Sequence, residues 1–247
     1  NRWHEHAFDQ VDRPLALSKY MGEEGLGGTG ISLRILLPRA WAHAEELTIE
    51  VANGENYALL AGEFFSIPSV LGRLKSFWDA SDSTYVELGL SGLWGANNHR
   101  GFLDDASGDV RDEPFRQTIL SGIDLSVVWS PPGMEKYRGL AWRSEAVWLH
   151  KQTEDGTVDA VGGYTYLDVR VSQILILGAR LDVGMNPEAG HAGWFWQASP
   201  YLTFWQSEFV FMRLQYGFTW ESESRDPEHI VMLQVDLSAG PHRHDKY

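Results

Sequence analysis

The stretch that decides the fold is residues 166–183, YLDVRVSQILILGARLDV, where apolar and polar side chains alternate on both sides of a short break at 172–173. The apolar positions are Leu167, Val169, Val171, Leu175, Leu177, Ala179, Leu181 and Val183; the polar positions are Tyr166, Asp168, Arg170, Gly178, Arg180 and Asp182. Alternation with a period of two is typical of a β-strand with two different faces. The stretch therefore predicts two strands joined by a tight turn.

The same pattern recurs along the chain in eleven ribbons. They cover residues 28–38, 45–52, 68–78, 83–94, 118–129, 140–148, 166–171, 175–183, 194–204, 210–219 and 230–239. Many reach about ten to fourteen residues, whereas a strand of a soluble sheet has about 5–6 and a transmembrane strand needs roughly 9–11. We therefore predict an all-β fold, an antiparallel transmembrane β-barrel in which residues 28–247 form one domain. Residues 1–27, which lack a sustained period, are predicted to be a loop or a plug in the lumen.

The composition narrows the class of protein. The 247 residues contain no Cys, which excludes disulfides and thiol chemistry, and a net charge of −14 argues against nucleic acid as a partner. The chain has eleven Trp and 13% aromatic residues, and Trp and Tyr favour membrane–water interfaces. Its mean hydropathy of −0.28 would suit a soluble protein, but half of each barrel strand faces water.

The connections alternate in length. Those at 39–44, 79–82, 130–136, 172–173 and 205–207 are short, and those at 53–67, 95–114, 151–157, 185–192 and 222–228 are long and polar. Outer-membrane barrels place short turns on the periplasmic side and long loops outside, so we expect that orientation. Single-chain bacterial barrels have an even number of strands. Eleven strands and the lack of a signal peptide therefore predict 12 or more strands, with an N-terminal part missing.

Aromatic residues cluster at the ends of the apolar faces, where they predict two lipid-interface girdles. They are Trp78 and Trp129 near short turns and Trp94, Trp148, Trp194 and Trp220 near long loops. A soluble β-sandwich would also bury one face of each strand, but it explains the strand length badly.

Several segments resemble an uncharacterised porin-like outer-membrane β-barrel family of Gram-negative bacteria. They include Asp12-Arg13-Pro14-Leu15, Phe77-Trp78-Asp79, Gly122-Ile123-Asp124-Leu125 and Ser199-Pro200-Tyr201-Leu202. The family is distantly similar to phosphate-selective porins and is sometimes labelled TonB-dependent receptor. The resemblance covers nearly the whole chain and implies a barrel and a conduit, without naming a solute. In such relatives the Arg-Pro-Leu segment follows several further strands, which agrees with the odd count.

The polar faces supply the candidate site, a set of charged residues predicted to face the lumen. The basic members are Arg34, Arg73, Lys75, Arg143, Arg170, Arg180 and Arg213, and the acidic members are Glu50, Glu87, Asp124, Glu145, Asp168, Asp182 and Asp236. Rings of one charge select ions, but the signs here are balanced. These residues either pair across strands and hold the wall together, or some of the arginines form a solute-facing eyelet.

Other constellations have simpler interpretations. His4 and His6, like His242 and His244, could form a zinc pair, but a site needs more ligands. The loop 103–113, with Asp104, Asp105, Asp109, Asp112 and Glu113, could bind Ca²⁺. Ser91 with Asn97 and His99 could suggest a hydrolase, yet a nucleophile must lie within reach of its base. We predict no metal, no cofactor and no enzymatic activity.

The leading hypothesis is a porin-like channel of the bacterial outer membrane for small hydrophilic solutes, or a barrel shell for a partner. The alternative is a closed structural or docking barrel, and an outer-membrane hydrolase ranks third. The expected partners are outer-membrane lipid and lipopolysaccharide, the barrel-assembly machinery, and other envelope proteins or further copies of the chain. The residues name neither the solute nor the oligomeric state.

Overall fold

A computed structural model describes residues 10–23, 25–62, 67–99, 102–103, 110–190, 193–207 and 209–237. Eleven strands form one sheet: β1 (Gly30–Leu37), β2 (Ala44–Ala52), β3 (Ser69–Ser81), β4 (Thr84–Ala96), β7 (Gln117–Trp129), β8 (Gly139–Gln152), β9 (Thr157–Arg170), β10 (Leu175–Met185), β11 (Trp194–Ser207), β12 (Val210–Glu221) and β13 (Glu228–Leu237). The short strands β5 (Phe102–Leu103) and β6 (Val110–Arg111) pair with each other. The prediction of an all-β fold with eleven long antiparallel strands is confirmed.

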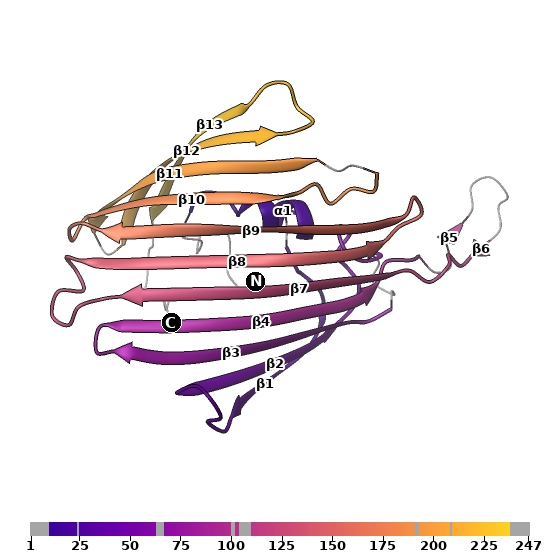
Figure 1. Ribbon diagram of the computed structural model, residues 1–247, viewed down its shortest axis with the longest axis horizontal. Helices are drawn as coiled ribbons and strands as arrows, with labels where there is room; N and C mark the ends of the chain where they lie inside the picture. Colours follow the sequence, from indigo (N-terminus) through magenta and orange to yellow (C-terminus); the bar gives the residue numbers. More distant parts are fainter. Residues whose placement is uncertain are drawn as a thin grey trace.

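The sheet is a meander in which each strand pairs with the next one along the chain, always antiparallel (Figure 1). β5 and β6 lie in the connection between β4 and β7 and do not join it. The strand order begins at β1 and ends at β13, and within the described residues no pairing joins these two strands. The sheet is therefore an open wall that is consistent with a barrel.

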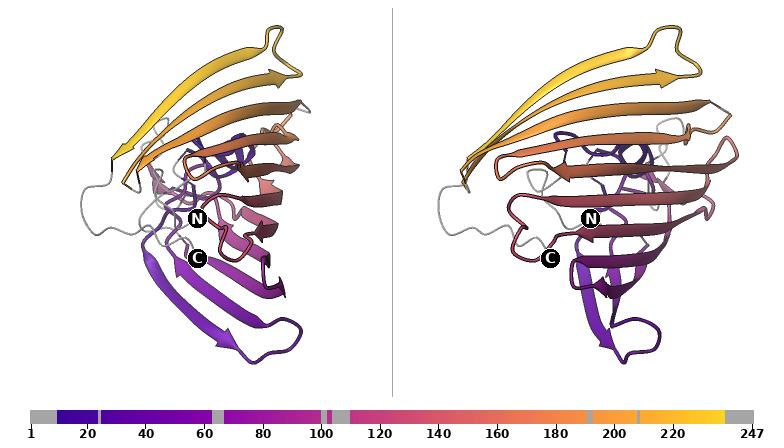
Figure 2. Two further views of the ribbon diagram at one scale, coloured as in Figure 1. Left: turned by 90° about the vertical axis from the view of Figure 1, so that its left-hand side faces the viewer. Right: turned by 60° about the vertical axis from the view of Figure 1, so that its left-hand side comes forward.

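The wall is strongly curved, and the helix α1 (Leu15–Met21) lies on its concave side (Figure 2). Residues 10–23, 25 and 26 run inside this curve before the chain enters β1. The helix in this segment was not predicted, and a role of the segment as a plug stays a prediction. The helix buries Ala16, Leu17, Tyr20 and Met21, which form one stripe of an amphipathic helix.

The two faces of the sheet differ as the alternation predicts. On the convex face, many large apolar side chains are exposed in rows along the strands, up to 80% for Ile31. They include Leu90 and Ile123 in the middle of the wall and, near its edges, Ile31, Leu33, Leu214 and Leu233. Within the described residues nothing packs on these rows. The described part of the chain thus shows none of the sheet-on-sheet packing of a β-sandwich.

An apolar patch on the concave face departs from the simple two-face rule. Seven apolar side chains of the wall are buried together with α1: Leu93, Leu120, Val147, Leu149, Val158, Ala160 and Phe195. Leu59 and Leu60, from the loop after β2, complete this cluster. Because the patch breaks the expected polar alternation, the sequence places the start of the seventh ribbon at 166, whereas the corresponding strand β9 begins at Thr157.

The connections follow the predicted lengths only in part: the one at 130–138, predicted to be short, has nine residues, whereas those at 186–193 and 222–227, predicted to be long, have eight and six. Those at 53–68 and 97–116 are long, and those at 82–83 and 208–209 are the shortest. The prediction of a long loop at 151–157 was wrong. Strands β8 and β9 extend further than expected, and only residues 153–156 join them. The backbone N–H of Thr153 donates to the carbonyl of Gly156 (2.7 Å), and Gly156 adopts a φ of 140° that only glycine reaches easily.

Candidate functional site

The fourteen charged residues predicted to face the lumen share the face of the sheet that carries α1. Directly paired residues of neighbouring strands lie on the same face. The pairing runs from Arg34 through Thr48 and Arg73 to Ser91 and Gly122, and on through Val147, Gly162, Gly184 and Phe195 to Glu221. Phe195 and Val147 pack in the cluster with α1, so this line marks the concave face. Thirteen of the fourteen are separated by an even number of positions from the residue of this line on their own strand. Asp236, on β13, lies two positions after Gln234, the ladder partner of Arg213.

The six tryptophans predicted for the lipid interfaces lie on the opposite, convex face. Trp94, Trp148, Trp194 and Trp220 lie near the strand ends that carry the long loops 53–68 and 97–116, and Trp78 and Trp129 near the other ends. The side chains of Trp94, Trp129, Trp148, Trp194 and Trp220 are 39–48% exposed. Trp78 packs edge-on against Trp41 at 5.3 Å between ring centroids. Their contact with lipid stays a prediction.

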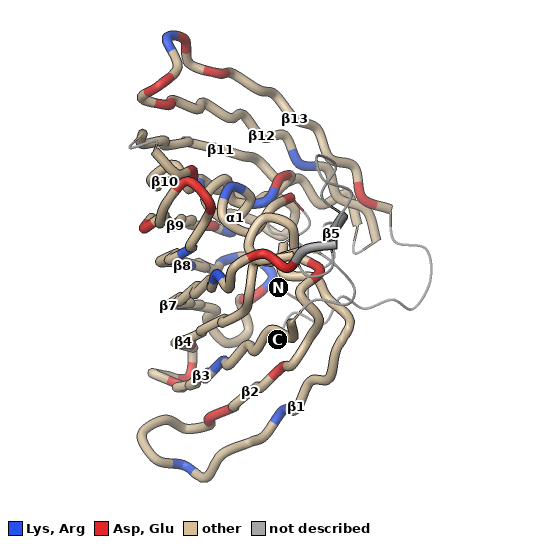
Figure 3. The backbone as a smooth tube through the Cα atoms, turned by 90° about the vertical axis from the view of Figure 1, so that its right-hand side faces the viewer, with Lys and Arg blue, Asp and Glu red and all other residues tan. Residues whose placement is uncertain are grey.

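On strands β1 to β7, residues of opposite charge are found on neighbouring strands of the wall (Figure 3). Arg73 contacts both carboxylate oxygens of Asp124 at 2.9 Å through one guanidinium nitrogen. Lys75 forms an ion pair with Glu87 at 2.6 Å. These contacts tie β3 to β7 and β3 to β4, as expected for charges that hold a wall together.

At the β1 edge the pairing differs from the predicted set. Arg34 forms its ion pair with Glu46 at 3.2 Å, a residue that the sequence does not single out. Glu50 accepts a hydrogen bond from the Ser32 hydroxyl (2.9 Å). The Arg34 side chain remains 51% exposed, so solvent screens this pair.

The middle of the wall combines charges with tyrosines. Tyr164 donates to Glu145 (3.1 Å), Arg143 donates to the hydroxyl of Tyr166 (2.7 Å), and the two tyrosine rings stack at 6.2 Å. Farther along, the Tyr201 hydroxyl donates to Asp168 (2.6 Å). The tyrosines therefore serve as partners for the predicted charges.

Near the β13 edge, Arg213 is held by polar neighbours on the adjacent strands. Its Nε donates to the Thr203 hydroxyl (2.9 Å) and its Nη1 to Gln234 (3.2 Å). Its guanidinium lies over the Phe211 ring at 5.1 Å. Asp236 lies on the concave face opposite Phe211 in the ladder, and Arg170 ends β9 two positions after Asp168.

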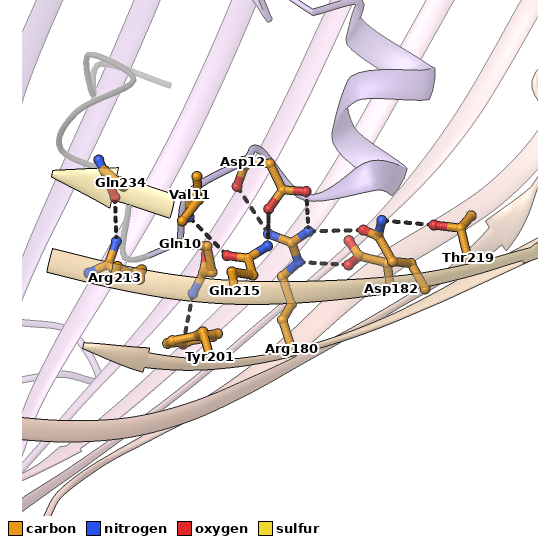
Figure 4. Close-up of polar contacts among 11 residues, drawn as sticks. Gln10, Val11, Asp12, Arg180, Asp182, Tyr201, Arg213, Gln215, Thr219 and Gln234 are labelled. Carbon is orange, nitrogen blue, oxygen red and sulfur yellow. Dashed lines mark hydrogen bonds and ion pairs between the residues drawn. The ribbon is translucent and has the colours of Figure 1, made fainter. Parts of the chain in front are cut away.

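The most buried part of the site surrounds Arg180, whose side chain is 0% exposed (Figure 4). Its Nε donates to Asp182 at 2.7 Å, and the Asp182 side chain is also 0% exposed. Its Nη2 donates to Gln197 (3.0 Å), which in turn donates to the Thr219 hydroxyl (2.9 Å). The remaining contacts of Arg180 go to Asp12, on the segment inside the wall.

Residues 10–12 lie along β10–β12 and are held by their side chains. Asp12 receives the Nη1 and Nη2 groups of Arg180 on its two carboxylate oxygens, at 3.0 and 3.1 Å, and the amide of Gln215 on one of them. The backbone N–H of Val11 donates to Gln215 Oε1 (2.9 Å), and the Gln10 amide donates to Tyr201 (3.1 Å). Figure 4 shows these contacts in one row.

Apolar packing provides the second anchor of this segment. Tyr20 is 1% exposed and donates to the carbonyl of Met185 (3.0 Å). Burial raises the pKa of the Tyr20 phenol to about 12, so the hydroxyl remains a donor at physiological pH. A Cβ on Gly162 would lie 2.8 Å from the Tyr20 hydroxyl oxygen, so a larger residue here would require the Tyr20 ring to shift. Asn56 closes the end of the helix by donating to the carbonyls of Met21 (2.8 Å) and Gly25 (2.7 Å).

The sequence does not reveal several of these residues as functional. Gln197 and Gln215 fall on predicted polar faces, and Asp12 lies in the predicted plug, but no spacing relates Asp12 to Arg180, 168 positions away. The usable signal was the alternation itself, because every polar-face position is a candidate for contacts with the interior. Partners from a separate segment need the tertiary structure.

The other constellations receive little support from the geometry. The Ser91 hydroxyl donates to the carbonyl of Gly122 (3.5 Å), and Asn97 donates to the carbonyl of Gln152 (2.7 Å). Ser91 forms no hydrogen bond with His99, which lies in the loop after β4. Among the described residues, no three His, Cys, Asp or Glu side chains form a group that could bind a metal. His4, His6, His242, His244, Asp104, Asp105 and Asp109 lie outside the described residues.

Comparison of the chain with protein-family models, curated proteins and solved structures finds no match. The resemblance to porin-like outer-membrane barrels therefore stays a prediction. Within the part of the chain that the structure describes, no α-helix is both long and apolar enough to cross a bilayer.

Proposed function

We propose that the chain forms the wall of a porin-like channel for small hydrophilic solutes in the bacterial outer membrane, narrowed by residues 10–26. The observation that carries this proposal is the contrast between the two faces. The convex face exposes rows of Leu, Val and Trp from β1 to β13, far more contiguous apolar surface than a soluble monomer exposes. The concave face carries paired charges and buried amides. Lipid outside and water inside match this arrangement.

A second candidate function is a closed docking barrel, favoured by the two anchors of residues 10–26. A segment with a buried ion pair at one end and an apolar helix at the other can block the interior. The two candidates differ in ion flow, so conductance across a planar lipid bilayer separates them. Stepwise, ohmic current supports the channel, and silence supports the closed barrel.

Releasing α1 is expected to raise the conductance. Leu17→Asp places a charge where the helix packs against the apolar patch, because Leu17 is 5% exposed and part of that cluster. Burial of an unpaired carboxylate is costly, so α1 should leave the wall and the current per channel should increase. Single-channel recording measures this.

Ser18→Asp provides the matched control for α1. Ser18 is next in sequence but only partly buried, and its variant should conduct like the unmodified protein. Equal conductance of the Leu17→Asp variant and the unmodified protein would argue against a plug. Equal increases in both variants would argue that any charge on the helix changes the current.

A channel in a membrane requires partners for β1 and β13, because unpaired backbone groups are not tolerated in lipid. Ten successive antiparallel pairings separate these strands in the order, so both run in the same direction. Direct closure, or closure with a second copy in the same orientation, would create a parallel seam. An odd number of additional antiparallel strands avoids this, and we propose that such strands complete the barrel.

This closure can be tested with engineered cysteines, since the chain has none of its own. Backbone amides of β1 and β13 are expected to be protected from hydrogen exchange in the membrane-embedded protein. No disulfide should form between cysteines on β1 and β13, because even a single intervening strand separates them by about 10 Å, whereas a disulfide needs Cα atoms about 4.4–6.8 Å apart. A disulfide within one chain would instead show direct closure, and one between two chains would show a dimer seam.

A further inference from the structure

The guanidinium of Arg180 receives most of its acceptors from the segment inside the wall. Its five N–H groups have five acceptors, and three of these belong to Asp12: the two carboxylate oxygens and the backbone carbonyl. Asp182 and Gln197 supply the other two. The contact between Arg180 and the Asp12 carboxylate is bidentate, which is the strong and geometrically specific form of this interaction. Arg180 therefore binds the Asp12 carboxylate in the way that a binding site holds a carboxylate ligand.

The wall half of this contact is built independently of Asp12. Asp182 holds the Nε of Arg180 and neutralises its charge, and both side chains are 0% exposed. Gln215 is also 0% exposed, and its side-chain amide donates to the Asp12 carboxylate oxygen that accepts the Nη1 group of Arg180. The Asp12 side chain, by contrast, is 29% exposed. A neutral, buried wall thus presents guanidinium and amide donors to a carboxylate that is open to solvent.

We propose that Arg180 and Gln215 form a carboxylate-binding site on the interior wall, which Asp12 occupies as a tethered ligand and a small aliphatic carboxylate can occupy instead. The chemistry of the site requires a planar anion with two oxygens, because the Nη1 and Nη2 groups donate in parallel to the two oxygens of Asp12. Within the described residues, the ion pairs of Arg180 are with Asp12 and Asp182.

Competition follows from the tether. A short flexible linker gives an attached ligand an effective concentration in the millimolar range, so a solute carboxylate at similar concentration can displace Asp12. Residues 10–12 would then leave β10–β12, whereas α1 stays in its apolar cluster. The binding of a carboxylate at this site does not depend on the proposed channel function. Its consequence for solute flow rests on the proposed channel function.

Acetate is a direct probe of the site in the Asp12→Ala variant. Removing the carboxylate takes one acceptor from each of the two terminal guanidinium nitrogens and the acceptor of the Gln215 amide, which should lower the unfolding temperature. Added acetate should bind and restore at least half of this loss in a saturable way. Acetamide at the same concentration, with ionic strength matched by sodium chloride, should restore none of it. If the variant folds only with acetate present, the yield of refolding in acetate against acetamide gives the same information.

Two further variants control the acetate experiment. Asp12→Asn fills the same space without the charge and should show no gain in acetate. Asp155→Ala removes an exposed carboxylate in the turn between β8 and β9, away from Arg180, and should also show none. Equal effects of acetate and acetamide on Asp12→Ala, or an equal acetate effect on Asp155→Ala, would overturn the proposal.

The experiment is performed in detergent, so that it does not depend on channel activity. An acetate effect with a silent channel would leave the binding site in place and reject the channel. Conductance without any acetate effect would reject the binding site alone.

Discussion

Replacing Arg180 with alanine is expected to lower the free energy of unfolding by about 3–5 kcal/mol. The change leaves Asp182, whose side chain is 0% exposed, without its cation, and it also frees Asp12 and Gln197 from their donor. Removing one partner of a buried pair costs more than the pair itself contributes, because the remaining charge stays uncompensated. Guanidinium-induced unfolding in detergent, followed by tryptophan fluorescence, measures the loss.

Arg34→Ala is the matched control for Arg180→Ala. Arg34 also faces the concave side and forms one ion pair, with Glu46, but its side chain is 51% exposed. Exposed ion pairs contribute about 0–1 kcal/mol, so this variant should lose little. Similar losses in the two arginine variants would show that the interior network around Arg180 does not have the stability that its burial indicates.

Leu125→Arg is expected to cost roughly 2–4 kcal/mol and to prevent assembly in a bilayer, because Leu125 lies on the convex face within β7. Ser126→Arg, one residue later, places the same side chain on the concave face. Ser126 is directly opposite Glu87 on one side and Arg143 on the other, so the new guanidinium gains a carboxylate neighbour. This second variant should fold normally.

The yield of folded protein in lipid vesicles tests the two arginine substitutions in β7. The effect depends on which face meets lipid, so the order of the yields is as informative as their size. Equal yields would contradict the assignment of the convex face to lipid, and a lower yield for Ser126→Arg would reverse the faces.

The two interpretations of the inward charges now carry different weight. Arg73 and Lys75 form cross-strand ion pairs with partners from the predicted set, as a wall held together by charges requires, whereas Arg180 pairs with Asp182 within β10. Arg180 in addition binds a segment that is not part of the wall. An eyelet built from several arginines finds less support than a single interior site around one arginine.

Much of the architecture could be predicted because a strand imposes a period of two on its side chains. Residues 166–183 predicted two strands, a tight turn and the faces of Asp168, Arg180 and Leu181, and β9 and β10 have these features. The six interface tryptophans were likewise placed on one face by alternation alone. Local backbone geometry decides such features, so a single stretch of sequence contains the information.

The alternation was misleading where a second segment covers the wall. Val158 and Ala160 face inward as apolar residues because α1 packs on them, and this hid the first half of β9. The prediction of a long loop at 151–157 was wrong for the same reason. The period of a strand predicts its faces, but what covers a face depends on segments far away in the chain.

From the sequence alone came the eleven strands, their order of polar and apolar faces, and the placement of six tryptophans on one face and of fourteen charged residues on the other. Only the tertiary structure decided that α1 forms inside the curve, that Asp12 reaches Arg180, and that β1 and β13 are the edges of the sheet. The first group follows from interactions within and between adjacent ribbons. The second depends on contacts across up to about two hundred residues, for which no local period exists.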